Sequence, residues 1–180
     1  MNDVYKSSIH MKLFDDRVHK LSSNFSCGNS FIDGFLKGNL SLNPGIGTTY
    51  VWLNDEESEI IGFYNITTGS LEYLDEDSRF KMGGAIHINE FALDEKYQGL
   101  YVDDNTEIKM SDMLLMDCIN RVMDFRKILG FSFVTLHSTS EGFNLYTRHD
   151  FIEIEDDMRL LALEGKERDC IAMYIPLDLE

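Results

Sequence analysis

Ala92-Leu93-Asp94-Glu95-Lys96-Tyr97-Gln98-Gly99 decides the fold, because this stretch joins a strand-like segment to a helix-like segment. Residues 85–93 before it alternate as a β-strand does. The alternation places two sets of side chains on opposite faces, with Ile86, Ile88, Glu90 and Ala92 on one and His87, Asn89, Phe91 and Leu93 on the other. After the stretch, apolar residues recur at helical spacing from 111 to 128, and Gly130 is a natural stop. The centre of the chain is therefore predicted to be a strand-loop-helix unit.

Short strands and helices are predicted on both sides of this unit. Runs rich in β-branched and aromatic residues predict strands at 9–14, 48–54, 60–68, 131–137, 151–154 and 170–175. Helical segments are predicted at 24–40, capped by Asn29 or Ser30, and at 140–149. Residues 160–163 are expected to extend the strand at 151–154, and residues 164–169 to connect it to the last strand. This order predicts an α/β fold with a central mixed, mostly antiparallel sheet of six to seven strands flanked by helices.

The size and composition of the chain fit one domain outside the membrane. With 180 residues, 43% of them hydrophobic, residues 1–180 are expected to form a single domain. No run approaches the roughly 18 apolar residues that a membrane helix needs, and the first residues do not read as a signal peptide. We therefore expect a cytoplasmic protein with no membrane partner.

Charge and cysteine spacing limit the ligands that the chain is expected to bind. It carries 32 acidic and 16 basic residues, for a formal charge of -16. Such a charge repels phosphate backbones and attracts cationic partners, which argues against nucleic acid as a partner. The charge can also be only a solvated surface that favours solubility. Cys27, Cys118 and Cys170 are far apart and lack the spacing of zinc sites or disulfide frameworks, so no metal site is expected.

Two segments resemble a known superfamily. The stretch that ends in Gln98 and Gly99 is similar to the start of the pyrophosphate-binding loop, Gln/Arg-x-x-Gly-x-Gly/Ala, of the GNAT superfamily of acetyl-CoA-dependent N-acetyltransferases. Asn144-Leu145-Tyr146-Thr147-Arg148-His149-Asp150-Phe151 resembles the Tyr-x-x-x-Gly-Phe of that superfamily, with Asp150 where glycine is usual.

Three further segments resemble the GNAT branch that includes acetyltransferase toxins. Phe25-Ser26-Cys27-Gly28-Asn29-Ser30-Phe31-Ile32-Asp33-Gly34-Phe35-Leu36 is similar to its signature Phe-x-Cys-Gly-x-x-x-Leu-Asp-x-aromatic-Leu. Ile61-Gly62-Phe63-Tyr64-Asn65-Ile66 resembles its Gly-Tyr-Tyr strand, and Met173-Tyr174-Ile175-Pro176-Leu177 resembles its closing strand. The resemblance spans nearly the whole chain and implies the GNAT fold, with acetyl-CoA as the acetyl-donor cosubstrate.

The resemblance also implies a set of residues that bind acetyl-CoA. They come from the strand end, the loop, the helix start and the end of the next strand: Ala92, Leu93, Gln98, Gly99, Leu100, Lys109, Met110, Ser111, Asp112 and Thr139. Glycines let the amides of such a loop approach a pyrophosphate, and the helix N-terminus adds positive potential. Here residues 101–108 are inserted and include Asp103, Asp104 and Glu107. These carboxylates are expected to weaken acetyl-CoA binding unless they point to solvent or pair with Lys109.

Acetyl transfer to an amine needs a neutral amine, a stabilised oxyanion and a proton for the departing thiolate. Glu90, a carboxylate on a mainly apolar strand, is the candidate base; alternatively it pairs with a cation or faces a wet rim. Tyr146 matches the family tyrosine that can protonate the thiolate; alternatively it is a core tyrosine. A backbone amide near Leu93 is expected to meet the oxyanion. His87 and His137 read more often as hydrogen-bonded core or rim residues than as catalytic ones.

Three functions remain open from the sequence. The leading hypothesis is an N-acetyltransferase acting on a primary amine of a small molecule or of a basic peptide or protein, with acetyl-CoA and a cationic amine as partners. A toxin that acetylates the amino acid carried on tRNA is the second, although it needs a basic surface. A GNAT fold that has lost catalysis and serves as a binding or regulatory module is the third. A homodimer is left open.

Overall fold

The computed structural model describes residues 9–75, 78–103, 105–161 and 169–177. Their centre is one eight-stranded sheet with the strand order β1-β2-β3-β4-β5-β8-β6, and β7 pairs with β3. The strands are β1 His10–Leu13, β2 Thr48–Leu53, β3 Ile60–Asp75, β4 Ser78–Leu93, β5 Phe133–Ser138, β6 Ile152–Glu153, β7 Met158–Leu161 and β8 Ile171–Pro176. The helices are α1 Ser30–Lys37, α2 Met110–Arg126 and α3 Phe143–Thr147, with 3-10 helices η1 His19–Asn24, η2 Leu40–Leu42 and η3 Glu95–Tyr97. Only β4 and β5 pair in parallel among these strands, which confirms the mixed, mostly antiparallel sheet.

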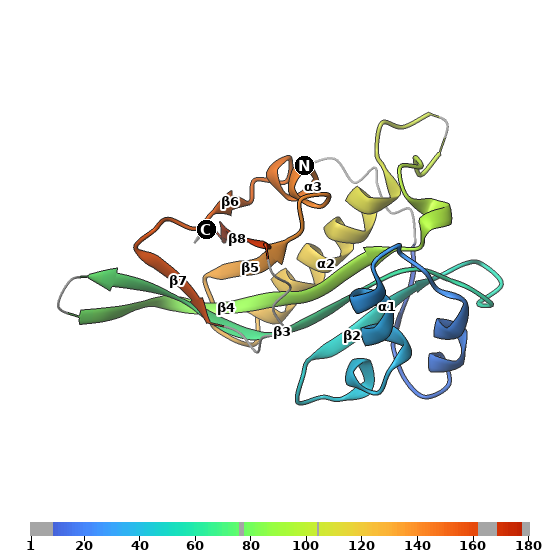
Figure 1. Ribbon diagram of the computed structural model, residues 1–180, viewed down its shortest axis with the longest axis horizontal. Helices are drawn as coiled ribbons and strands as arrows, with labels where there is room; N and C mark the ends of the chain where they lie inside the picture. Colours follow the sequence, from blue (N-terminus) through green and yellow to red (C-terminus); the bar gives the residue numbers. More distant parts are fainter. Residues whose placement is uncertain (1–8, 76–77, 104, 162–168, 178–180) are drawn as a thin grey trace.

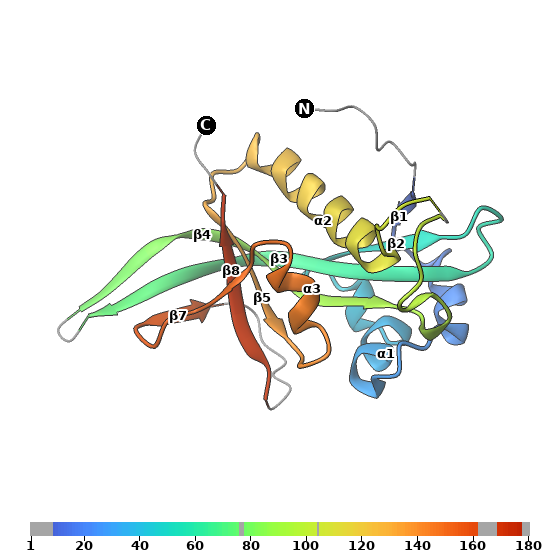
Figure 2. The same ribbon diagram turned by 90° about the horizontal axis from the view of Figure 1, so that it is seen from above.

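Helices cover both faces of the sheet, so the sheet has a core on each side (Figures 1 and 2). On the α2 face, Leu114 and Cys118 are completely buried against a cluster that includes Tyr64 of β3. On the α1 face, Phe35 and Phe63 stack with their ring centres 6.3 Å apart. The two cores hold β3 and β4 from both sides.

Strand β4 does not alternate regularly along its length. Glu90 pairs with Asn65 and Ile88 pairs with Ile66, so Asn89 is an extra residue and forms a β-bulge. Four apolar side chains of β4 therefore reach the α2 core, Ile86, Ile88, Phe91 and Leu93. Ala92 packs in the α1 core, and Glu90, two residues away, shares its face. The predicted faces are correct for Glu90 with Ala92 and wrong for Ile86 and Ile88, because a strict period of two assumes no inserted residue.

The bulge lies where β4 leaves β5. The parallel pairing of the two strands runs from Ala85 with Phe133 to Ile88 with Leu136 and then ends. β5 continues beyond Leu136, but its partner there is β8, up to Ser138 with Ile171. The carboxyl ends of β4 and β5 therefore splay apart in the middle of the sheet.

Strand β7 is a correction to the predicted topology. Residues 158–161 do not extend the strand at 151–154; they pair antiparallel with β3, from Ser70 with Leu161 to Tyr73 with Met158. Leu160 is buried there with Leu71 and Tyr174, and this small cluster explains why the segment crosses to β3. The sheet therefore has eight strands instead of six to seven. The connection predicted at 164–169 lies outside the described residues except for Asp169.

The predicted helices are present but shorter than expected. α1 occupies only part of 24–40, and the Oδ1 of Asn29 accepts from the amides of Phe31 and Ile32, which confirms the predicted cap. α3 likewise occupies only the middle of 140–149. None of the described helices is both long and apolar enough to cross a membrane.

His87 is buried at the β4–β5 junction. Its Nδ1 lies 3.0 Å from the Thr135 Oγ1, and its ring contacts the His137 ring edge-on at 5.4 Å. Burial, with a smaller effect of His137, lowers the pKa of His87 from 6.5 to about 3. The imidazole is therefore neutral at physiological pH and belongs to the structure of the sheet.

This lowered pKa makes folding stability depend on pH. Below pH 6.5 the unfolded chain protonates His87 while the folded chain does not, so stability present above pH 6.5 is lost as the pH falls toward 3. The loss from this group is expected to reach about 2 kcal/mol at pH 5, at about 1.4 kcal/mol per pH unit. In urea denaturation at pH 7 and pH 5, His87→Asn should lose less stability between the two pH values than the wild type. An equal loss in both proteins would contradict the assignment.

Candidate active site

The splay between β4 and β5 opens into a cleft of about 1060 Å³. Its walls come from α1, the end of β4, the loop after it, the start of α2, the end of β5 and α3. Segments far apart in the sequence therefore meet at one place.

Most of the residues predicted for the site line this cleft. They are Glu90, Ala92, Leu93, Gln98, Gly99, Lys109, Ser111, Thr139 and Tyr146. Leu100, Met110 and Asp112 were predicted to bind the cofactor and do not line it. The Leu100 side chain is half exposed, whereas Met110 packs against the α2 core. A backbone hydrogen bond links Leu100 to Met110, because the Met110 amide donates to the Leu100 carbonyl at 2.9 Å.

Gln98 lines the cleft and also joins two segments of the chain. Its Nε2 donates to the Cys27 carbonyl at 2.9 Å and to the Leu93 carbonyl at 3.0 Å. The side chain therefore ties the end of β4 to the segment before α1. Gly99, next to it, has a φ of 74°, a conformation that glycine adopts without steric cost.

The acidic insertion folds away from the cleft. Tyr101 and Lys109 form an antiparallel bridge, and the Val102 amide donates to the Ile108 carbonyl at 2.9 Å. Figure 1 shows this loop rising from the first turn of α2, away from the sheet. Asp103 and Glu107 therefore lie outside the cleft, because the bridge closes the insertion at its base.

Asp112 joins the start of α2 to the end of α3. Its Oδ2 accepts from the Lys109 amide at 3.1 Å, and its Oδ1 accepts from Arg148 at 2.7 Å and lies 2.8 Å from His149 Nε2. Burial raises the pKa of Asp112, but the hydrogen bonds from Arg148, His149 and the Lys109 amide outweigh it and hold the pKa below its ordinary value. Asp112 is thus a helix cap and ion-pair residue, and sequence reasoning missed Arg148, which does line the cleft.

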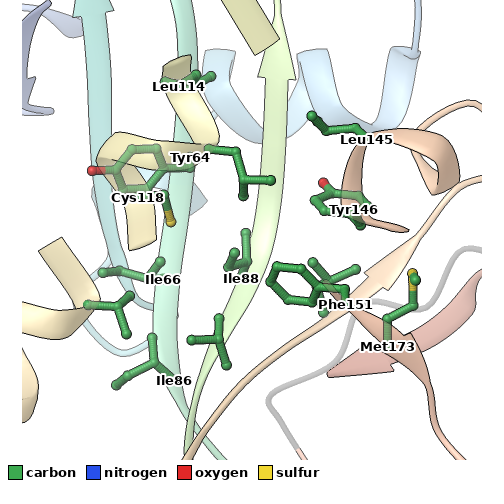
Figure 3. Packing of buried hydrophobic residues seen from close by; sticks show 14 of the residues in the cluster. Tyr64, Ile66, Ile86, Ile88, Leu114, Cys118, Leu145, Tyr146, Phe151 and Met173 are labelled. Carbon is green, nitrogen blue, oxygen red and sulfur yellow. The ribbon is translucent and has the colours of Figure 1, made fainter. Parts of the chain in front are cut away.

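Tyr146 stands at the edge of the splay. Its ring packs edge-on against Phe91 at 6.0 Å and Phe151 at 5.7 Å, and Figure 3 shows it in the same packed cluster as Tyr64. Burial, with Cys118 and Glu90 nearby, raises the pKa of Tyr146 above its ordinary value of 10. The hydroxyl therefore remains protonated and can donate.

The turn after α3 explains one departure from the family pattern. Asp150 has a φ of 66°, in the left-handed region where glycine is usual. Aspartate tolerates this region better than most residues, so the turn keeps its shape without glycine.

Backbone amides of β4 face the splay. The Leu93 carbonyl accepts from Gln98, whereas the next amide, of Asp94, donates across to Ile61 of β3. The amide and carbonyl of one residue point the same way in an antiparallel ladder, and successive residues alternate. The amides of Leu93 and Phe91 therefore point toward the opening, close to Tyr146.

Two other reactive side chains of the cleft, Cys27 and His87, are neutral. Burial raises the pKa of the Cys27 thiol to about 12, so this residue is not a thiolate. His87 is neutral for the reason given above, and His137 lies against it. Within the described part of the chain, no group of three or more His, Cys, Asp or Glu side chains could hold a metal ion.

The fold is shared with solved structures, although no family model and no curated protein matches the chain. AtaTR bound with AcCoA superimposes with a TM-score of 0.71 at 17% identity, over 93% of each chain. AtaT complexed with acetyl-methionyl-tRNAfMet gives a TM-score of 0.68 at 17% identity, over 93% of this chain and 94% of that one. A structure described as a bacterial toxin gives 0.68 at 18% identity, over 93% and 91%. The fold implied by the resemblance to GNAT toxins is confirmed.

The Asp112 cluster should contribute to stability. Asp112→Asn keeps an oxygen for the helix cap but loses the charge that Arg148 and His149 contact. We expect a loss of about 1 to 2 kcal/mol, since a hydrogen bond to a charged group is worth about that much. The matched control is Asp124→Asn on the same helix, because the Asp124–Lys127 pair is exposed and worth under about 1 kcal/mol. Equal melting temperatures for the two variants would contradict the role of Asp112.

Shortening the insertion should not improve the affinity for acetyl-CoA, the expected donor. A two-residue Asn-Gly turn in place of residues 102–108 suits the antiparallel bridge between Tyr101 and Lys109. The affinity should stay unchanged in calorimetric titration, because Asp103 and Glu107 lie outside the cleft. Some stability should be lost, because Val102 and Ile108 pack against the α2 core. Tighter binding in the shortened protein would show that the carboxylates do impair the site.

Proposed function

We propose that the protein transfers an acetyl group from acetyl-CoA to a primary amine. The observation that carries this proposal is the splay itself, where the amides of Phe91 and Leu93, the Tyr146 hydroxyl and the Glu90 carboxylate meet one cleft. The neighbours with this fold, AtaTR with AcCoA and AtaT with an acetylated tRNA, support acetyl-CoA as the donor.

The cleft offers a place for each part of the donor. The open edge of β4 presents amides and carbonyls to an extended amide-bearing arm, as an adjacent strand would. Thr139 lies on the opposite side of the opening, at the end of β5. Lys109 and Arg148 are the Lys and Arg residues among the described lining, and together with Gly99 and Ser111 they suit a pyrophosphate.

The chain supplies a group for each chemical need. Tyr146 donates the proton to the departing thiolate, since its raised pKa keeps the proton at neutral pH. The amide of Phe91 or Leu93 meets the negative charge that develops on the acetyl oxygen. Glu90 accepts a proton from the ammonium, directly or through water, because it lines the same cleft.

A second candidate is acetylation of the amino acid carried on tRNA. The specific observation in its favour is that AtaT, a neighbour at 93% coverage of this chain, is in complex with acetyl-methionyl-tRNAfMet. The charge of -16 opposes it, because any RNA contact would depend on local basic patches. The expectation against nucleic acid is therefore weaker than the composition alone suggested.

The test joins binding with turnover. Acetyl-CoA at a hundred times its dissociation constant should add about 2.7 kcal/mol to the native state and raise the melting temperature by several degrees. Tyr146→Phe should keep that thermal shift, because the ring still packs on Phe91 and Phe151. Its kcat with an amine acceptor should fall by about 100-fold, the usual scale for a lost general acid.

Other outcomes of these two experiments would support a different function or a different role for Tyr146. No thermal shift with acetyl-CoA would reject the proposal. A shift with no turnover for any amine would favour the catalytically silent binding module. Equal loss of affinity and turnover in Tyr146→Phe would make the tyrosine a packing residue.

A further inference from the structure

One half of the cleft has an apolar wall. Phe31, Ile32 and Phe35 of α1, Leu40 of η2 and Ile46 line it. Phe31 is 47% exposed and Leu40 is 54% exposed, so they are not buried in the core that the rest of α1 forms. Apolar side chains left open in a concave site are typical of a surface that binds an apolar group.

Buried hydrogen bonds fix this wall to the bulge of β4. Asn89 Nδ2 donates to the Ile46 carbonyl at 2.9 Å and to Asn65 Oδ1 at 2.8 Å. Asn65 Nδ2 donates to Thr49 Oγ1 at 2.9 Å, and Thr49 Oγ1 donates to the Ser41 carbonyl at 2.7 Å. Asn65, Thr49 and Ser41 are each at most 2% exposed.

The chain of hydrogen bonds ends on α1. Ser41 Oγ donates to the Leu36 carbonyl at 3.0 Å, so one polar path runs from the bulge to the helix that carries Phe31. We call Asn89, Asn65, Thr49 and Ser41 the polar chain. A mostly buried hydrogen-bond network of this kind fixes geometry, so the wall is held in place before any ligand arrives.

Charged side chains line the cleft from different elements of the fold, with Glu90, Glu95 and Glu141 as the acidic ones and Lys109 and Arg148 as basic ones. Glu90 shares the face of the sheet that α1 covers, and it lines the cleft together with the apolar wall. Lys109 and Arg148 lie at the start of α2 and the end of α3, where the phosphates of the donor are placed under the proposed function. An ammonium is therefore matched by Glu90, and the group that carries it meets the apolar wall.

We infer that the acetyl acceptor is a primary amine carried on an apolar group, such as an α-amino group beside an aliphatic or aromatic side chain. This inference rests on the proposed acetyl transfer and adds the class of acceptor. A chain of charge -16 would attract polyamines and aminoglycosides by charge alone, and Glu95 and Glu141 also line the cleft, but the apolar wall itself gives no partner to their further cations and hydroxyls.

The test compares acceptors of equal chemistry and different side chain. Release of the CoA thiol is followed with leucinamide, glycinamide, lysinamide and spermidine. Leucinamide should exceed glycinamide and lysinamide in kcat/KM by about 10- to 100-fold, the range expected for burying one aliphatic side chain. Parallel assays with leucyl-tRNA, glycyl-tRNA and lysyl-tRNA separate a small-molecule source of the amine from a tRNA source. The same preference in either set supports the inference.

Variants of the wall localise the preference. Leu40→Asn should raise KM for the leucyl acceptor about 10-fold, leave kcat unchanged, and affect the glycyl acceptor little. The matched control is Leu129→Asn, because Leu129 is 56% exposed and lies outside the cleft. Both positions are exposed, so neither variant should fail to fold.

The outcomes separate this inference from the proposed function. Acetyl-CoA binding with turnover that favours lysinamide or spermidine, or that favours no acceptor, would overturn the apolar acceptor and leave acetyl transfer standing. Equal effects of Leu40→Asn and Leu129→Asn would overturn the role of the wall. Absence of acetyl-CoA binding would overturn both.

Discussion

The parting of β4 from β5 is the constraint on which the rest of the structure depends. The two strands share only four paired residues, from Ala85 with Phe133 to Ile88 with Leu136, in a sheet whose other strands pair antiparallel. Beyond that point β5 keeps β8 as a partner, while the outer edge of β4 pairs with no strand in the part of the chain that the structure describes. Unpaired backbone groups in a protein interior are costly, so such an edge has to face a ligand, water or a side chain. Gln98 satisfies one carbonyl of that edge, and the remainder faces the cleft.

Two helices close the opening from opposite ends, and each is fixed by polar contacts instead of by packing alone. Asp112 links the first turn of α2 to Arg148 and His149 after α3. On the other face, Asp33 Oδ1 of α1 accepts from the Cys27 amide at 2.8 Å, which holds the turn before the helix. The motif Phe25-Ser26-Cys27-Gly28 therefore has a structural explanation: its backbone is bonded by Asp33 and by Gln98 at once.

Much of the fold could be predicted from the sequence because local patterns specify it. Helical spacing and the Asn29 cap identified α2 and α1, and the patterns of apolar, β-branched and aromatic residues identified every strand except β7. The features that the sequence analysis did not predict share one cause. The bulge at Asn89, the crossing of β7 to β3 and the clamp from Asp112 to Arg148 all depend on partners far away in sequence, and a single residue carries no local sign of them. Likewise, the sequence alone suggests that the carboxylates of residues 103 and 107 lie near a bound phosphate. The bridge between Tyr101 and Lys109, which directs this loop away from the cleft, is not visible in the sequence.

The polar chain limits which substitutions this protein can accept during evolution. Asn89 sits in β4, Asn65 in β3, Thr49 in β2 and Ser41 in η2, so four segments contribute one member each. Loss of the Asn89 or Thr49 side chain leaves a buried polar group of Asn65 without this partner, which costs about 1 to 3 kcal/mol, whereas Thr49 bonds to the backbone carbonyl of Ser41. A new acceptor preference is therefore most easily acquired by substituting side chains of the wall. Replacing the whole α1 segment by one from another protein would require the four residues of the polar chain to be replaced with it. The apolar wall and the β-bulge are therefore expected to have evolved together.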